Sequence, residues 1–268
     1  MRSQSPAAKP SRTNPLQGAL RVFGALVIRE MITRYGRSPG GYVWAVLDPA
    51  GMIAILALAF SQFIHTPPLG ESFILFYATG YIPFYAYSEI ASVVSSSIFV
   101  NRQLMHFPMV TPLDSVLARF FLSFLTVIAV SFLVFTTLLV VTDDPVRLSL
   151  GPLFLALGTA AFLGLGIGTL NAVVFTFFPL WQRVWSIINR PLFILSAVFF
   201  TFESLPRQAR DVLWWNPIIH LVGEARRAFY PIYRGDYIML AYPLGIAGFC
   251  LLVGGFLLLR NRSAIIEV

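Results

Sequence analysis

The residues of this chain that could do enzymatic chemistry are few and far apart. Residues 36–40 (GRSPG) match the Gly-x-Ser-x-Gly pattern of a nucleophile elbow, which needs a strand before the serine and a helix after it. Ser38 instead lies between a predicted surface helix and a long apolar block, which indicates a Gly/Pro hinge. The histidines fall in three separate loops, at His65, His106 and His220, and no spacing of His, Cys and Asp suits a metal. We therefore expect neither a catalytic site nor a metal site.

The chain also lacks the residues of a nucleotide site. A phosphate-binding loop needs Gly-x4-Gly-Lys, whereas the only lysine is Lys9, preceded by Ala8 in a polar segment. We therefore expect no cofactor in this chain, and any ATP that it uses would be bound by another chain.

Most of the sequence is organised as apolar blocks that are long enough to cross a bilayer. Of its residues 57% are apolar and 12% are charged, which excludes a disordered chain. A bilayer core of about 30 Å needs about 20 apolar residues, which cross as a helix because lipid offers the backbone no hydrogen bonds. The net charge of +7 does not indicate nucleic-acid binding, because the basic residues cluster at the ends of the blocks. The predicted class is an all-α integral membrane protein with six transmembrane helices, at 41–64, 73–97, 116–142, 151–178, 187–202 and 239–259.

The N-terminal region differs in character from the transmembrane domain that we predict over 41–268. Residues 1–15 are polar and rich in Pro and Ser, which predicts a disordered tail. Residues 16–40 are predicted to form a cytoplasmic amphipathic interface helix, which Gly and Pro residues end. Its apolar stripe is imperfect, because Arg34 falls on the apolar side.

The segment between spans five and six, 203–238, is apolar but broken by prolines. We predict two re-entrant helices there, over about 206–214 and 217–230. Asn216 followed by Pro217 is the pattern of an N-cap and a first helical residue.

Basic residues near the span ends predict the orientation. Four arginines lie between residues 21 and 37, whereas the loop 65–72 after the first span has no Lys or Arg. The positive-inside rule places the N-terminus in the cytoplasm, and an even number of spans places the C-terminus there too. The five arginines within 203–238 would then lie outside, against the rule, and an odd number of spans would instead move the C-terminus outside.

Two features within the spans indicate packing. Glu89 lies deep in span two, where an ion pair with a basic residue such as Arg119 is the first interpretation and a proton relay the alternative. Ala160, Gly164 and Gly168 form a row of small residues on span four that lets two helices approach closely. This row favours packing within the subunit, with contact between two copies as the alternative.

Four stretches together resemble the membrane subunits of ABC-2 type exporters of capsular polysaccharide and O-antigen. They are REMITRYGRSPGGYVWAVLDP (29–49), FPMVTPLDSVLAR (107–119), FFTFESLP (199–206) and NPIIHLVGEARRAFYP (216–231). The resemblance implies a permease of the bacterial inner membrane that moves a lipid-linked capsular polysaccharide to the periplasm. Export of O-antigen, teichoic acid or a small amphiphile is the alternative. A membrane-embedded acyl- or glycosyltransferase would need clustered His, Asp or Glu, which the sequence lacks.

The same resemblance implies the partners. It implies a homodimer, two copies of a cytoplasmic ABC ATPase that hold ATP and Mg, and export proteins of the periplasm and outer membrane. It also implies that spans one and five line the conduit, that the re-entrant helices lie on the outer side, and that 99–110 is the coupling helix that inserts into the ATPase. The coupling residues would be Asn101, Arg102, Gln103, Leu104, Met105, His106 and Phe107.

Aromatic and basic residues are the candidates for contact with such a substrate. Sugar rings stack on aromatic faces, although most aromatic residues simply face lipid or core. Arginines near the cytoplasmic entrance could attract an anionic lipid-linked end, with anchoring to anionic headgroups as the alternative. The path candidates are Trp44, Phe60, Phe63, Trp181, Trp185, Phe193 and Phe199, and the entrance candidates are Arg29, Arg34, Arg37, Arg183 and Arg190.

Overall fold

The computed structural model describes residues 15–36, 40–63, 65–107, 110–142 and 148–267, and all the regular secondary structure in these ranges is helical. The predicted tail, except Pro15, and Arg37 lie outside the described residues. The longer helices are α1 (Pro15–Tyr35), α2 (Gly41–Ser61), α3 (Phe73–Ser95), α5 (Pro112–Val141), α6 (Leu150–Phe177), α7 (Pro179–Ile194), α9 (Pro217–Phe229) and α10 (Ala241–Arg260). The shorter ones are α4 (Ser97–Asn101), the 3₁₀ helices η1 (Arg102–His106) and η2 (Phe202–Ser204), α8 (Arg207–Leu213) and α11 (Arg262–Glu267).

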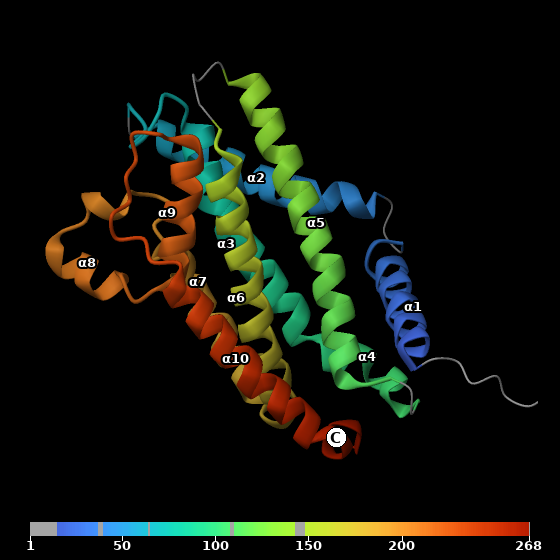
Figure 1. Ribbon diagram of the computed structural model, residues 1–268. Coiled ribbons are helices and arrows are strands. Elements are labelled where there is room, and N and C mark those ends of the chain that lie inside the picture. The colour runs from blue at the N-terminus through green and yellow to red at the C-terminus, as the bar shows by residue number, and fades with distance from the viewer. Residues whose placement is uncertain (1–14, 37–39, 64, 108–109, 143–147, 268) are drawn as a thin grey trace, which may run out of the picture.

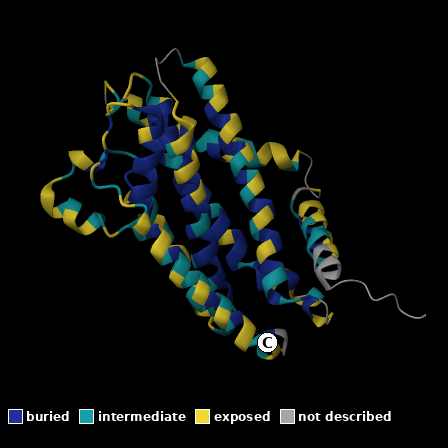
Figure 2. Ribbon diagram, in the orientation of Figure 1, coloured by how far each residue is buried: buried dark blue, intermediate teal, exposed yellow. Residues whose placement is uncertain are grey.

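Four of the described helices are long and apolar enough to cross a membrane: α2, α5, α6 and α10. Helix α3 is long enough but carries four tyrosines and several serines. It packs against α2, α5, α6 and α9 and is largely buried, as Figure 2 shows in dark blue. A helix that is surrounded by protein rather than lipid does not need an apolar surface on every side. In Figure 1, α2 runs across the direction that α3, α5 and α6 share.

Our boundaries for the fifth span were wrong. The helix begins at Pro179, directly after α6, and ends at Ile194, whereas we predicted 187–202. Its 16 residues rise about 24 Å at 1.5 Å per residue, less than a bilayer core. Residues 195–201 are not helical, and Ala197 has a positive φ of 57°, which a right-handed helix excludes.

The proline-broken segment folds as its local signals predict. We predicted helices over 206–214 and 217–230, and α8 and α9 lie within one residue of these bounds. The N-cap prediction is confirmed, because Asn216 accepts a hydrogen bond of 3.0 Å from the backbone N–H of Ile218. Helix α9 is almost wholly buried against α3 and α6.

The connection between α3 and α5 is not one coupling helix over 99–110. The short α-helix α4 is followed directly by the 3₁₀ helix η1. Residues 108–109 lie outside the described residues. Helix α5 then begins at Pro112, four residues before the predicted start, because Thr111 and Asp114 form a capping box.

Small residues on α6 set how closely the central helices approach. A Cβ atom on Gly164 would lie 2.9 Å from the carbonyl oxygen of Tyr87 on α3, and one on Gly168 would lie 2.8 Å from Val94. Gly166 meets the carbonyl group of Ala247 on α10 in the same way. The prediction that this row packs within the subunit is confirmed.

The connecting elements gather at the two ends of the bundle. In Figure 1, α1, α4 and the C-terminal α11 lie at one end, whereas the loop before α3 and the beginning of α6 lie at the other. Helix α11 contacts η1. We call the first of these the α4 end.

Candidate functional site

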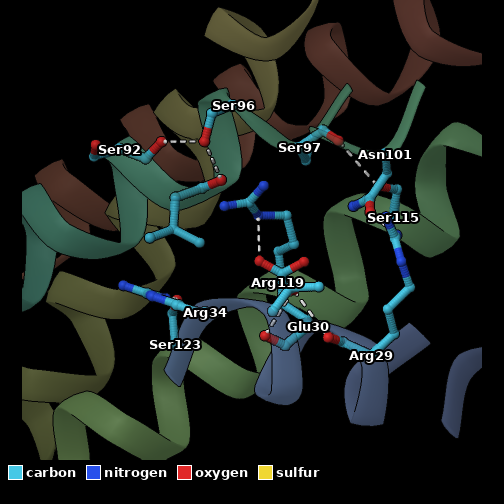
Figure 3. A network of polar contacts seen from close by, with 12 residues as sticks. Arg29, Glu30, Arg34, Ser92, Ser96, Ser97, Asn101, Ser115, Arg119 and Ser123 are labelled. Atoms are coloured by element: carbon cyan, nitrogen blue, oxygen red, sulfur yellow. Dashed lines mark hydrogen bonds and ion pairs between the residues drawn. The ribbon is translucent and has the colours of Figure 1, made fainter. Parts of the chain in front are cut away.

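A network of charged and polar side chains joins α1 to α3, α4 and α5 (Figure 3). Arg34 forms an ion pair with Glu89 on α3 and donates a hydrogen bond of 2.8 Å to Ser123 on α5. Glu30 lies 3.3 Å from the Nε atom of Arg119, and both side chains are less than a tenth exposed. The prediction of an ion pair for Glu89 is therefore confirmed, but the partner that we named, Arg119, was wrong.

The same network reaches the predicted coupling residues. Arg29 donates a hydrogen bond of 2.6 Å to the side-chain oxygen of Asn101, whose amide group donates one of 2.7 Å to Ser115. Ser115 in turn donates to the carbonyl oxygen of Ser97. A chain of hydrogen bonds thus connects α1 with α4 and the beginning of α5.

The structure separates the candidate entrance arginines. Arg29 and Arg34 belong to this network. The guanidinium group of Arg29 donates to Asn101, and that of Arg34 pairs with Glu89. Arg183 and Arg190 are exposed on α7. The positive charge that the sequence suggested for one cytoplasmic face is thus divided between two elements.

A polar hollow of about 470 Å³ lies between α3 and α7, and we call it the polar groove. Its α3 side presents residues 88, 92, 95 and 96, and its α7 side presents residues 182, 186 and 189; in both helices this spacing places the side chains on one face. The polar residues that line it are Ser88, Glu89, Ser92, Ser95, Ser96, Gln182, Ser186 and Asn189, and Trp185 lies beside them. Sequence reasoning missed this groove, although the serine spacing on span two was a signal for it.

Glu89 also lines a second hollow of about 340 Å³, on the α2 side of α3. This hollow is lined by Arg34, Trp44, Asp48 and Tyr85 as well. The ion pair between Arg34 and Glu89 therefore lies where the two hollows meet.

The groove offers hydrogen-bond acceptors and amide donors to a ligand. The hydroxyl groups of Ser88, Ser96 and Ser186 donate to carbonyl oxygens of their own helices, and Asn189 donates to the carbonyl oxygen of Trp185. These bonds use the hydroxyl hydrogens of the three serines and one of the two amide hydrogens of Asn189, and they leave oxygen lone pairs free. Such a surface suits a ligand that is rich in hydroxyl groups, and the ring of Trp185 adds an apolar face.

The predicted path aromatics divide into groups with different surroundings. Trp44 and Trp185 line the two hollows. Trp181 packs on Trp185 and donates a hydrogen bond of 3.2 Å to Asn171. Phe60, Phe193 and Phe199 pack against one another and against α3, in ring contacts of 5.0–5.9 Å that also involve Tyr81 and Phe84, and Phe63 is exposed at the end of α2.

The predicted coupling residues point in two directions. Asn101 and Met105 are buried and Leu104 is half-buried, whereas Arg102, Gln103, His106 and Phe107 are exposed. Phe99, beside them, is 84% exposed. The residues of this segment that a partner could contact are therefore the exposed ones.

Helix α9 holds buried polar residues that the sequence did not single out. Arg226 is fully buried, donates to the carbonyl oxygens of Phe200 and Val198, and lies 4.4 Å from the ring centre of Phe76. One of the arginines that conflicted with the positive-inside rule is thus a packing residue.

Burial raises the pKa of Tyr233, in the loop after α9, to about 12, so this phenol stays protonated.

The histidines do not come together. His220 is buried and its Nε2–H donates a hydrogen bond of 3.0 Å to the carbonyl oxygen of Trp214, whereas His65 and His106 are exposed. Among the described residues no group of three or more His, Cys, Asp and Glu side chains could hold a metal ion.

Comparisons with known proteins identify the family. The polysialic acid transport protein KpsM of Escherichia coli is 32% identical over 89% of this chain and 92% of its own length. The capsule polysaccharide export inner-membrane protein CtrC of Neisseria meningitidis is 28% identical over 78% of this chain and 79% of its own length. The capsule polysaccharide export inner-membrane protein BexB of Haemophilus influenzae is 26% identical over 92% of this chain and 93% of its own length. The sequence profile of the ABC-2 type transporter family matches residues 21–230. This chain therefore belongs to the ABC-2 type transporter family.

Proposed function

We propose that this protein is the membrane-spanning permease subunit of an ABC exporter that moves a lipid-linked capsular polysaccharide from the cytoplasm to the periplasm. The observation that carries the proposal is the similarity, over about nine-tenths of both chains, to subunits named for polysialic acid transport and capsule polysaccharide export. The polar groove adds a chemical reason, because its acceptor oxygens and the ring of Trp185 suit sugar hydroxyls and sugar faces.

A wet, lined path is needed because a polar polymer that crossed hydrocarbon unaided would lose many hydrogen bonds. Helix α7 has no buried residue in this single chain, and it exposes Leu180 and Ile187 beside the polar groove. Such an uncovered amphipathic helix supports a homodimer in which α7 and α2 of two copies enclose the conduit. Export proteins of the periplasm and outer membrane would receive the polymer.

The arrangement of the ends supports six spans with both termini in the cytoplasm. The α4 end holds α1, α4 and α11 together (Figure 1), as an even number of crossings requires. In this topology α3, α5, α6, α7 with residues 195–201, and α10 cross the membrane, and α2 crosses it at a steep tilt to them (Figure 1). Helices α8 and α9 are re-entrant from the outer side.

The α4 end would then receive the ATPase, which holds ATP and Mg. The exposed Gln103 and Phe107 would insert into it, and the hydrogen bonds that join Asn101 to Arg29 and Ser115 would transmit its motion to α1 and α5.

The test is export in the bacterium that carries this chain and its paired ATPase. Deletion of the chain should remove polysaccharide from the cell surface and leave polymer in the cytoplasm, and expression from a plasmid should restore it. Surface capsule that is unchanged by the deletion, or loss of O-antigen or teichoic acid in its place, would contradict the proposal.

A further inference from the structure

A cavity of about 450 Å³ adjoins the polar groove and is also lined by residues of α4, η1 and α11. The two share Ser95, Ser96, Phe175 and Gln182. The cavity lies among the end of α3, α4, α6, the beginning of α7, and α11. Its volume is in the range of sites for small molecules.

The walls of this cavity are apolar except for one cation and a polar rim. Ile98, Phe99, Phe175, Pro179 and Ile265 form most of the surface. Arg102 supplies the positive charge, and no carboxylate lines the cavity. Among the side chains that the structure describes, which do not include that of Glu267, no Asp or Glu lies within 4.0 Å of the Arg102 guanidinium. An acidic group of a ligand is therefore the missing counter-charge.

Cavity and groove together present three chemistries next to one another: an apolar wall, a guanidinium group, and a row of hydroxyl and amide groups. A sugar polymer that is attached through a phosphate to an acyl lipid carries a group that suits each of the three. We propose that the cavity binds the phosphate-bearing acyl end of such a substrate, with Arg102 as the phosphate ligand and the polar groove as the seat of the first sugars. This inference rests on the proposed function and adds a site to it.

The guanidinium group suits this role because its N–H donors can form two parallel hydrogen bonds to one phosphate. The sequence had placed Arg102 among the residues that contact the ATPase. The two roles make different predictions, because a residue that faces the cavity affects lipid binding and one that faces the ATPase affects its association.

The experiment measures binding without export. The full-length chain is purified with its ATPase in nanodiscs of neutral lipid and exposed to a diacyl lipid whose phosphate carries one sugar and whose acyl chain carries a photoreactive diazirine. Crosslinked residues are located by mass spectrometry. Arg102→Gln should lower crosslinking at the cavity by about tenfold, the loss expected for one charge-assisted contact. Arg102→Lys should retain part of it, and Arg207→Gln, an exposed arginine on α8, should bind as the wild type.

Competition identifies the ligand. The unlabelled lipid with both phosphate and sugar should compete, and the glycolipid without phosphate should not. Equal competition by phosphatidylglycerol would overturn the proposal in favour of a site for ordinary membrane lipid. Unchanged crosslinking in Arg102→Gln would overturn it too, and loss of ATPase from that variant with crosslinking intact would assign Arg102 to the ATPase.

Failure of this site and failure of the proposed function are distinguishable. If deletion of the chain leaves the capsule unchanged, export of capsule is refuted whatever the probe does. If deletion abolishes the capsule but Arg102→Gln binds the probe normally, the export function stands and only the lipid site falls.

Discussion

The buried ion pair between Glu30 and Arg119 should hold α1 against the bundle, and Glu30→Leu should release it. The two side chains are 6% and 8% exposed. Removal of one member of a buried pair leaves the other charge without compensation, which costs about 3–5 kcal/mol. For a chain of this size each kcal/mol lowers the melting temperature by roughly 2–4 °C, so we expect a decrease of about 6–20 °C.

The local readout is α1 itself. Its remaining apolar contacts with the bundle involve a small cluster of Leu26, Val110 and Ala118, so the loss of the pair should first appear as undocking of α1. In detergent, thermal stability by size exclusion should fall, and limited proteolysis between α1 and α2 should become faster. Asp211→Asn, at an exposed carboxylate on α8, is the control and should change the free energy of unfolding by less than about 0.5 kcal/mol.

The double variant Glu30→Leu/Arg119→Met decides whether charge is the cause. It removes both charges and keeps apolar volume, so it should recover most of the lost stability. If the single variant is as stable as the wild type, or if the double variant is as unstable as the single one, the assignment of the pair is refuted.

Further substitutions test the packing, the coupling segment and the groove. In the same thermal assay, Gly166→Ala should destabilise the fold by about 1–3 kcal/mol, because the new Cβ atom would overlap a carbonyl group of α10. The control Gly158→Ala has open space around it and should be neutral or slightly stabilising. Phe107→Ala should reduce co-purification of the ATPase without loss of stability, whereas Met105→Ala, at a side chain only 2% exposed, should cost about 2–5 kcal/mol; the reverse pattern would contradict our assignment of the exposed face. Trp185→Ala should lower surface polysaccharide several-fold with normal amounts of protein in the membrane, and normal export would remove this residue from the path.

Much of the architecture could be predicted because its signals are local. Asn216 and Pro217 are adjacent, and they begin α9 at the predicted residue. Runs of about 20 apolar residues identify α2, α5, α6 and α10 without knowledge of their neighbours. The fifth span failed because its apolar run continued through residues 195–201, where the backbone leaves the helix at Ala197.

The sequence by itself determined that the chain is helical and apolar, where its Pro- and Gly-rich breaks fall, and which family it resembles, because each of these depends on residues that are close in sequence. The tertiary structure alone decided that Arg34 rather than Arg119 meets Glu89, that Met105 points inward, and that the serines of α3 face the amide groups of α7. The physical reason is that two helices distant in sequence meet in a register set by packing, here by close approaches such as that of Gly164 to α3, and no local pattern encodes that register.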